Sequence, residues 1–336
     1  MYITSEKFHS CHNANVLVLV LIVISAMTII AFGLAYQTRM EIRLSKSSSQ
    51  QVSLQHIAMS GIEAGKAVLS GKELTCEQTA RICRFYSTKD NLKLFEQLKS
   101  PLNEDIQIAF WIRDESSFLD LNKSNPAIWE NLPALGRDKI ACILDWIDKD
   151  SDTNPDGAES DYYKGLEPSY SCKNDSLICL KELLFVNNIT RDDYLGGIIH
   201  DEMSDPEDIE QQLSLINTFT TFSQETVNIN TVPGMILLIF PGLDQEAVDI
   251  LLAFRTGPDG LENTDDDQYF QNAEDILQLE GLTDLHKELL GQYCCFNSDI
   301  FRVFSYARLN QQSCFLMATV RAVENKPEII CIERLL

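Results

Sequence analysis

The longest apolar run of the chain lies near its N-terminus. From Asn15 to Thr38 no side chain is charged, and aliphatic residues dominate the run. A run of this length spans a bilayer as one helix, whereas the apolar core of a cleaved secretory signal is shorter. Apolar residues then recur at three- and four-residue spacing to about residue 70. The pattern predicts a membrane-spanning helix over 15–37 that continues as a helix in water.

Strands are predicted at both ends of the remaining chain. Apolar and polar residues alternate over 106–115 and 116–122, which favours a β-hairpin there. The C-terminal part alternates in the same way over three segments that are separated by polar turns, namely 301–309, 314–323 and 329–335.

Between these strand regions lie about 170 residues with helical periodicity and acidic loops. The helical segments are 128–148, 176–186, 233–255 and 273–293. The simplest topology is an α+β fold in which residues 38–122 and 296–336 form one domain with the long helix. An all-helical domain over 123–295 is inserted between the strands.

The charge balance is strongly acidic, although the composition is otherwise that of a globular protein. There are 27 Lys and Arg against 50 Asp and Glu, which gives a net charge of −23. Such a polyanion repels nucleic acid and anionic lipid headgroups, so it favours cations or a basic partner instead.

Two loops of the insert concentrate carboxylates around a Pro-Asp-Gly turn. The acidic residues are Asp148, Asp150, Asp152, Asp156, Glu159 and Asp161 in the first loop, and Asp259, Glu262, Asp265, Asp266 and Asp267 in the second. Like charges at this density repel one another unless a cation or water screens them. Alternating carboxylates without His or Cys favour Ca²⁺ over a transition metal, with solvated acidic loops as the alternative.

Four cysteines occur as two pairs with the same spacing, Cys76 with Cys83 and Cys172 with Cys179. Each pair encloses a short polar stretch, and neither has the spacing or the nearby histidine of a zinc site. We predict two local disulfides in an oxidising compartment, with free thiols as the alternative. We let this cysteine usage outweigh the three basic residues after the apolar run. By the positive-inside rule, those residues would place the C-terminal part in the cytoplasm.

Two segments, PGLDQEAVDILLAFR and LEGLTDLHKELL, resemble the hairpins of helix-hairpin-helix (SAM-like) units, which hold duplex phosphates in DNA-binding proteins. The residues around them are mostly acidic: Asp244, Glu246, Asp249, Glu280 and Asp284, with Lys287 as the basic exception. They are predicted to be packing units that bind no nucleic acid. The chain also has no GxGxxG, P-loop, HExxH or GxSxG motif, so we expect neither enzyme activity nor a small-molecule substrate.

Three strings, together with the apolar N-terminal helix, resemble the minor pseudopilin K family of the type II secretion system. They are DWxDxDxxxxPDGAExDYY, VNINTVPGMIL and PGLDQEAVDILLAFRTGPDG. The resemblance covers nearly the whole chain. It implies a pilin-like antiparallel sheet with a helical insertion, bound calcium and no catalysis. It further implies a place at the tip of the periplasmic pseudopilus with the minor pseudopilins I and J, where the protein helps to initiate assembly and protein export.

The same resemblance implies processing by prepilin peptidase at the Ala14–Asn15 bond. Removal of the leader 1–14 would leave a single-pass anchor in the bacterial inner membrane and the C-terminal domain in the periplasm. The fifth mature residue is then Leu19, where most pilin-like proteins have Glu. An apolar residue suits a subunit with no neighbour above it. The alternative function is a membrane-tethered DNA-uptake receptor that uses its helix-hairpin-helix-like repeats.

Overall fold

The computed structural model describes residues 12–70, 74–87, 106–132, 135–196, 214–262, 264–309, 312–323 and 326–335. The chain divides into two units, Met1–His56 and Ile57–Leu336.

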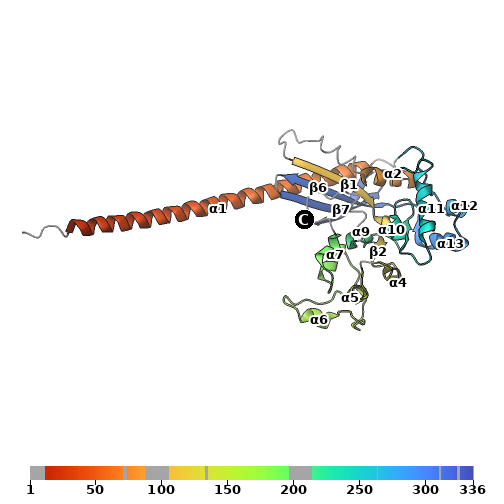
Figure 1. Ribbon diagram of the computed structural model, residues 1–336, viewed down its shortest axis with the longest axis horizontal. Helices are drawn as coiled ribbons and strands as arrows, with labels where there is room; N and C mark the ends of the chain where they lie inside the picture. The colour runs from red at the N-terminus through yellow and green to blue at the C-terminus, as the bar shows by residue number, and fades with distance from the viewer. Residues whose placement is uncertain are drawn as a thin grey trace, which may run out of the picture. The chain divides into compact units, whose positions relative to one another are not determined.

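The first unit contains most of helix α1 (His12–Leu69), which is drawn in red to orange in Figure 1. Large apolar side chains between Val16 and Tyr36 are exposed, and α1 is long and apolar enough to cross a membrane. The continuous helix predicted from the sequence is therefore confirmed. Ala14 and Asn15 lie in its first turn, whereas residues 1–11 of the predicted leader are outside the described residues.

The second unit is built on a four-stranded antiparallel sheet with the order β1-β6-β7-β8. Its strands are β1 (Ile106–Asp114), β6 (Ile300–Leu309), β7 (Gln312–Val323) and β8 (Lys326–Arg334). The C-terminal strands β6 to β8 form the meander that the alternating pattern predicts. β1 joins them from a distant part of the sequence by pairing with β6.

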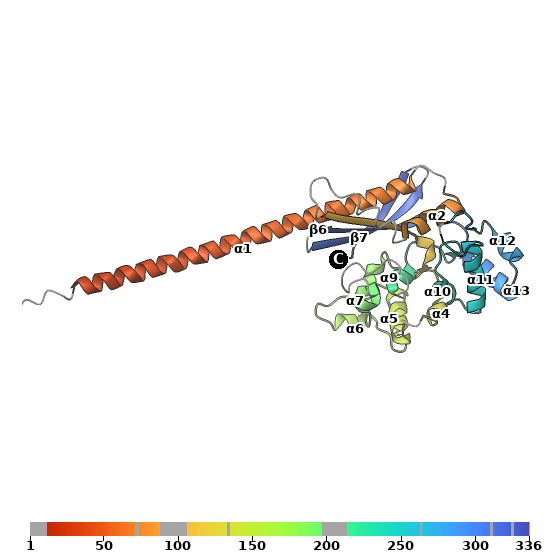
Figure 2. The same ribbon diagram turned by 45° about the horizontal axis from the view of Figure 1, so that its top comes forward.

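The two faces of this sheet are covered differently (Figures 1 and 2). On one face, the C-terminal end of α1 approaches β6 at two glycines. A Cβ added to Gly61 would lie 2.2 Å from Ser305 Oγ, and one added to Gly65 would lie 2.4 Å from Val303 Cγ1. On the other face, aromatic residues of the sheet such as Trp111 belong to the same buried core as the inserted domain.

The hairpin predicted over 106–122 is wrong. The chain leaves β1 through the short 3₁₀ helix η1 (Glu115–Ser117), where Asp114 Oδ1 accepts a 2.8 Å hydrogen bond from the Ser116 N–H. The next strand, β2 (Leu119–Asp120), pairs in parallel with β3 (Phe219–Thr220) of the insert. Alternation marks a strand but does not specify its partner, and here both partners come from far along the chain.

The inserted domain is mainly helical. The helix α2 (Cys76–Ser87) precedes β1 in the sequence and packs beside that strand, outside the insert. The elements of the insert are α4 (Pro126–Trp129), α5 (Arg137–Ile147), α6 (Ser160–Lys164), η2 (Leu180–Phe185), α7 (Arg191–Leu195), α9 (Leu215–Thr218), α10 (Gly234–Leu237), α11 (Gln245–Thr256), α12 (Ala273–Gln278) and α13 (Asp284–Tyr293).

The insert differs from the predicted all-helical domain in two respects. It contains β3 and the parallel pair β4 (Val227–Asn228) and β5 (Cys294–Cys295). The long helices predicted over 233–255 and 273–293 are each divided into two by a hairpin. Gly242 and Gly281 occupy these hairpins with φ values of 89° and 90°, a region that favours glycine. In each case two helices and the hairpin between them form one unit.

Candidate metal centre

The loop after α5 brings three carboxylates together. Oxygens of Asp148, Asp150 and Glu159 lie within 4.8 Å of one another. Asp148 is the C-cap of α5, where its N–H donates to the Leu144 carbonyl at 2.9 Å. Glu159 is the N-cap of α6 and accepts from the Ser160 N–H at 3.0 Å. The cluster is therefore held between the end of one helix and the beginning of the next.

A fourth carboxylate, that of Asp145, lies in the last turn of α5 and is fully buried. Its Oδ1 accepts hydrogen bonds from the backbone N–H and the side-chain amide of Asn154 at 3.1 and 2.5 Å. A Cβ added to Gly157 would lie 2.1 Å from Asp145 Oδ2. The loop can therefore close over this carboxylate only because residue 157 is glycine.

Several buried oxygens of this loop accept no hydrogen bond from the described residues. They are Asp145 Oδ2, Asp148 Oδ1, Glu159 Oε1 and Asn174 Oδ1. Asn174 is tied to the loop because its side-chain amide donates to the Asp150 carbonyl. A buried polar group without a partner costs about 1–3 kcal/mol. Carboxylate and amide oxygens are the ligands of hard cations such as Ca²⁺, so the donor set fits that ion.

The electrostatics of the loop also suit a cation. Burial raises the pKa of Asp148, and the charges of Asp150, Glu159 and Asp145 raise it further. Both effects disfavour the ionised carboxylate, because water is removed and like charges lie nearby. A divalent ion would neutralise this repulsion.

The cluster thus contains only three of the six carboxylates predicted for the first loop. Asp152, Asp156 and Asp161 are exposed and lie outside the cluster of three. Sequence reasoning missed Asp145 and Asn174. Asp145 lies one helical turn before Asp148, a spacing that places two side chains on one helix face and could have identified it. Asn174 lies well beyond the acidic run, and no local pattern marks it.

The second loop is stabilised in another way. Asp267 is buried and forms a 2.9 Å ion pair with Arg84 Nη1 of α2. Thr264 Oγ1 donates to Asp266 Oδ1 at 2.8 Å; this bond, followed by one from the Asp259 N–H, lowers the pKa of Asp266. The remaining predicted residues, Glu262 and Asp265, are exposed. Within the described part of the loop no group of three carboxylates converges, so calcium here stays a prediction from the sequence.

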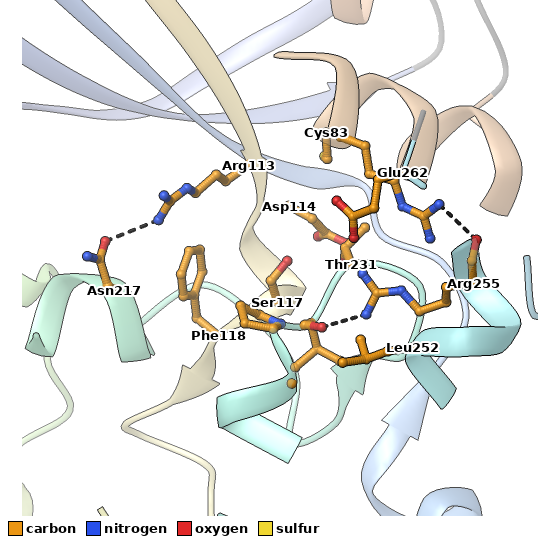
Figure 3. Close-up of a pocket in the computed structure, with 14 residues that line it drawn as sticks. Cys83, Arg113, Asp114, Ser117, Phe118, Asn217, Thr231, Leu252, Arg255 and Glu262 are labelled. Carbon is orange, nitrogen blue, oxygen red and sulfur yellow. Dashed lines mark hydrogen bonds between the residues drawn. The ribbon is translucent and has the colours of Figure 1, made fainter. Parts of the chain in front are cut away.

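A cavity of about 260 Å³ with both polar and apolar lining residues lies between α2, the end of β1 and helices α10 and α11 (Figure 3). Its lining includes Arg84, Arg113 and Arg255, each more than nine-tenths buried. Arg84 donates to the Arg255 carbonyl at 3.2 Å, and Arg113 to Asn217 Oδ1 at 3.1 Å. Arg255 donates to the Val232 carbonyl at 2.7 Å. The bonds of Arg84 and Arg113 fasten α2 and β1 to the insert, whereas the bond of Arg255 lies within the insert.

Two further residues of the cavity have shifted pKa values. Burial raises the pKa of Asp114, although hydrogen bonds from Thr231, Ser298 and other neighbours lower it in part. Burial also holds the pKa of the Cys83 thiol well above its usual range. A nucleophilic cysteine needs the opposite shift, toward the thiolate.

Neither predicted disulfide is present in the structure, where Cys76, Cys83, Cys172 and Cys179 are free thiols. Cys76 and Cys83 lie on α2 instead of enclosing a loop. A helical rise of about 1.5 Å per residue separates their Cα atoms by roughly 10 Å, beyond the roughly 7 Å limit for a disulfide. Cys172 is buried, and its Sγ donates to the Asp145 carbonyl at 3.2 Å.

The described residues thus combine a long apolar helix, an antiparallel sheet and a mainly helical insert with a carboxylate loop. Residues 131–196 match the family described as type II secretion system (T2SS), protein K. This range contains the whole carboxylate loop and Asn174.

The fold is similar to that of a chain in the crystal structure of the GspK-GspI-GspJ complex from the type 2 secretion system of enterotoxigenic Escherichia coli. The TM-score is 0.52 at 14% identity, and the match covers 89% of this chain and 99% of that chain. No curated protein sequence matches the chain significantly. Together these findings confirm the resemblance to minor pseudopilin K and the predicted α+β fold, and they support a role in type II secretion.

Proposed function

We propose that this protein is a structural minor pseudopilin at the tip of the type II secretion pseudopilus, where it helps to initiate assembly and protein export. The observation that carries the proposal is the family match over 131–196, because it falls on the insert that distinguishes this chain from a simple pilin fold. The apolar Leu19 supports the tip position, since a subunit with no neighbour above it has no terminal amine to pair with a glutamate.

The proposed partners are the minor pseudopilins I and J. The solved structure with a similar fold is titled as a complex of GspK with GspI and GspJ. We expect the full chain, purified in detergent, to co-purify with I and J of the same system in one stable complex. The major pseudopilin of that system is the control and should not replace them. Failure to retain either I or J would contradict the proposal.

The anchor and its orientation belong to the same proposal. Prepilin peptidase would cleave the Ala14–Asn15 bond, and α1 would then hold the protein in the bacterial inner membrane. The soluble part of the second unit would lie in the periplasm. The length and apolar character of the first half of α1 support a single membrane span.

We also propose that the first acidic loop binds Ca²⁺ through Asp148, Asp150 and Glu159, with Asp145 and Asn174 as further oxygen donors. Support comes from the buried acceptor oxygens that lack hydrogen bonds within the described residues. Titration calorimetry of the full chain should detect calcium binding that Glu159→Gln weakens at least tenfold. Asp161→Asn removes a charge from the same loop outside the cluster, so it should leave the affinity unchanged. Equal weakening of calcium binding by both variants would mean that the overall charge of the loop attracts the ion and that no defined site exists.

The DNA-uptake alternative is not favoured by the surface of the helix-hairpin-helix-like units. Glu246, Asp249, Glu280 and Asp284 are exposed around the two hairpins. Duplex phosphates would meet carboxylates there, and affinity for nucleic acid depends on the opposite charge. Saturable binding of duplex DNA to the full chain at low salt would reverse this preference.

A further inference from the structure

Three basic residues lie on α1 directly after its apolar part. Arg39, Arg43 and Lys46 follow the uncharged run, and all three are exposed within the first unit. The helix is unbroken through this segment, as Figure 1 shows. At 3.6 residues per turn, spacings of four and three residues place the three side chains within an arc of about 60°. These residues are called the basic face of α1 below.

Little in this part of the chain neutralises the basic face. Glu41 is the only acidic residue between positions 39 and 62 of the sequence, and the helical repeat places it on the opposite side of α1. None of the three basic residues forms an ion pair in the part of the chain that the structure describes. In a chain with a net charge of −23, this cluster of cations favours an anionic ligand.

The length of the apolar part determines how far the basic face lies from a membrane. The exposed apolar segment from Val16 to Tyr36 is about 30 Å long, which matches the hydrocarbon core of a bilayer. Tyr36 ends this segment and is 69% exposed, and tyrosine is common at the level of the headgroups. Along the helix, Arg39 lies about 4.5 Å beyond Tyr36 and Lys46 about 15 Å beyond it.

The basic side chains reach back over much of this distance. In a helix the Cα–Cβ bonds tilt toward the N-terminus, which for this segment is the direction of the membrane. The long stems of Arg and Lys then carry the charge toward the interface. Because the headgroup layer itself is about 5–7 Å thick, Lys46 lies within about one Debye length of it. Arginine can also donate two parallel hydrogen bonds to one phosphate group.

We propose that the basic face of α1 binds anionic phospholipids through the phosphate groups of the leaflet from which the helix emerges. The inference rests on the anchor in the proposed function, because the apolar part of α1 must span the bilayer to bring the basic face to its surface. In the proposed orientation, this is the periplasmic leaflet of the inner membrane. Binding on one side only gives α1 a preferred direction of tilt, with the basic face turned toward the bilayer.

The test uses the full chain, purified in a neutral detergent and titrated with phosphatidylglycerol or with phosphatidylcholine. Native mass spectrometry counts the lipid molecules that each protein molecule retains. We expect retention of phosphatidylglycerol at concentrations at least tenfold lower than those needed for phosphatidylcholine, since each basic residue near a membrane surface contributes about fivefold. The triple variant Arg39→Gln, Arg43→Gln, Lys46→Gln should lose most of this preference. Glutamine favours helix, so circular dichroism should show α1 intact.

A matched control removes three exposed cations of the second unit, through Lys164→Gln, Arg321→Gln and Lys326→Gln. This variant changes the net charge equally and should keep the preference for phosphatidylglycerol. Equal retention of both lipids by the unmodified chain, or an equal loss in both triple variants, would overturn the proposal. Millimolar inorganic phosphate should displace phosphatidylglycerol no more than sodium chloride of the same ionic strength. Stronger displacement by phosphate would identify a site for the free ion and overturn the lipid assignment.

The measurement needs neither the minor pseudopilins I and J nor prepilin peptidase. A chain that prefers phosphatidylglycerol but fails to bind I and J would leave this inference standing and count against the proposed function. A chain that binds I and J without a preference for phosphatidylglycerol would overturn this inference alone.

Discussion

Arg302 of β6 and Glu115 of η1 form a buried ion pair where the sheet meets the insert. The Nη2–Oε1 distance is 2.6 Å and the Nε–Oε2 distance is 3.0 Å, and each side chain is 1% exposed. The guanidinium group also donates to the carbonyls of Ile216 and Phe219 at 2.6 and 3.2 Å, and it lies 4.3 Å from the centre of the Phe118 ring. The Arg302 side chain therefore neutralises the buried carboxylate of Glu115 and donates hydrogen bonds to two backbone carbonyls.

Removal of one partner from this pair should destabilise the second unit strongly. Arg302→Met leaves Glu115 buried without its cation, and such a change costs about 3–5 kcal/mol. Denaturant unfolding of the full chain should show this loss. The double variant Arg302→Met, Glu115→Leu should recover part of it, because no buried charge then remains. Arg321→Met, at an exposed position of β7, is the control. A loss equal to that of the control would contradict the role of the pair.

The glycine contacts between α1 and β6 give a second prediction. A methyl group at residue 65 would lie 2.4 Å from Val303 Cγ1, so Gly65→Ala should cost about 1–3 kcal/mol through overpacking. Gly291 on α13 has nothing within 4 Å of an added Cβ. Gly291→Ala should therefore be neutral or stabilising by up to about 1 kcal/mol, because alanine favours helix. The melting temperature should fall for Gly65→Ala and stay unchanged or rise for Gly291→Ala. Equal shifts for the two variants would argue against the close approach of α1 to β6.

The raised pKa of Asp148 gives a prediction for the protein in chelator. A carboxyl group whose pKa is higher in the folded state contributes stability at low pH, and this is lost as the pH rises through the folded pKa. Asp148→Asn should therefore raise the melting temperature at neutral pH, with a difference from the unmodified chain that shrinks toward about pH 4. Asp161→Asn should give a difference that varies little with pH. A constant difference for Asp148→Asn would contradict the repulsion inferred for the loop.

Calcium should reverse this effect. At a free concentration 100-fold above the dissociation constant, binding to the folded state stabilises it by about 3 kcal/mol. Melting scans in chelator and in millimolar Ca²⁺ should show the gain, which Gly157→Ala should reduce, because a Cβ there would lie 2.1 Å from Asp145 Oδ2. Magnesium should substitute poorly, since it demands a tighter octahedral site. An equal gain with both ions would point to simple screening.

The processing step predicts a defined N-terminus. Intact-mass measurement of the membrane form should show a chain that begins at Asn15 and retains the helix as its anchor. Ala14→Leu should block the cut and leave the leader attached, whereas the neighbouring substitution Asn13→Ala is the control. A chain that keeps Met1, or one cut beyond Tyr36, would overturn this prediction.

Local patterns in the sequence determined the elements whose formation depends on neighbouring residues. The uncharged run of 15–38 specifies the first part of α1, because its mostly aliphatic side chains favour an apolar surrounding. Alternation specifies β6 to β8, whose turns connect consecutive strands. The first acidic loop was visible because Asp148, Asp150 and Glu159 lie within one short stretch.

Only the tertiary structure decided the pairings between distant residues. β1 takes β6 as its partner because Arg302 and the insert hold Glu115 after the strand. Asp267 of the second acidic loop is paired with Arg84, which α2 brings to it from a distant part of the sequence. Asn174 joins the first acidic loop in the same way, through its hydrogen bond to the Asp150 carbonyl. The spacing of residues along a chain encodes periodicity and charge density, whereas contacts between distant segments depend on packing, which no single stretch of sequence contains.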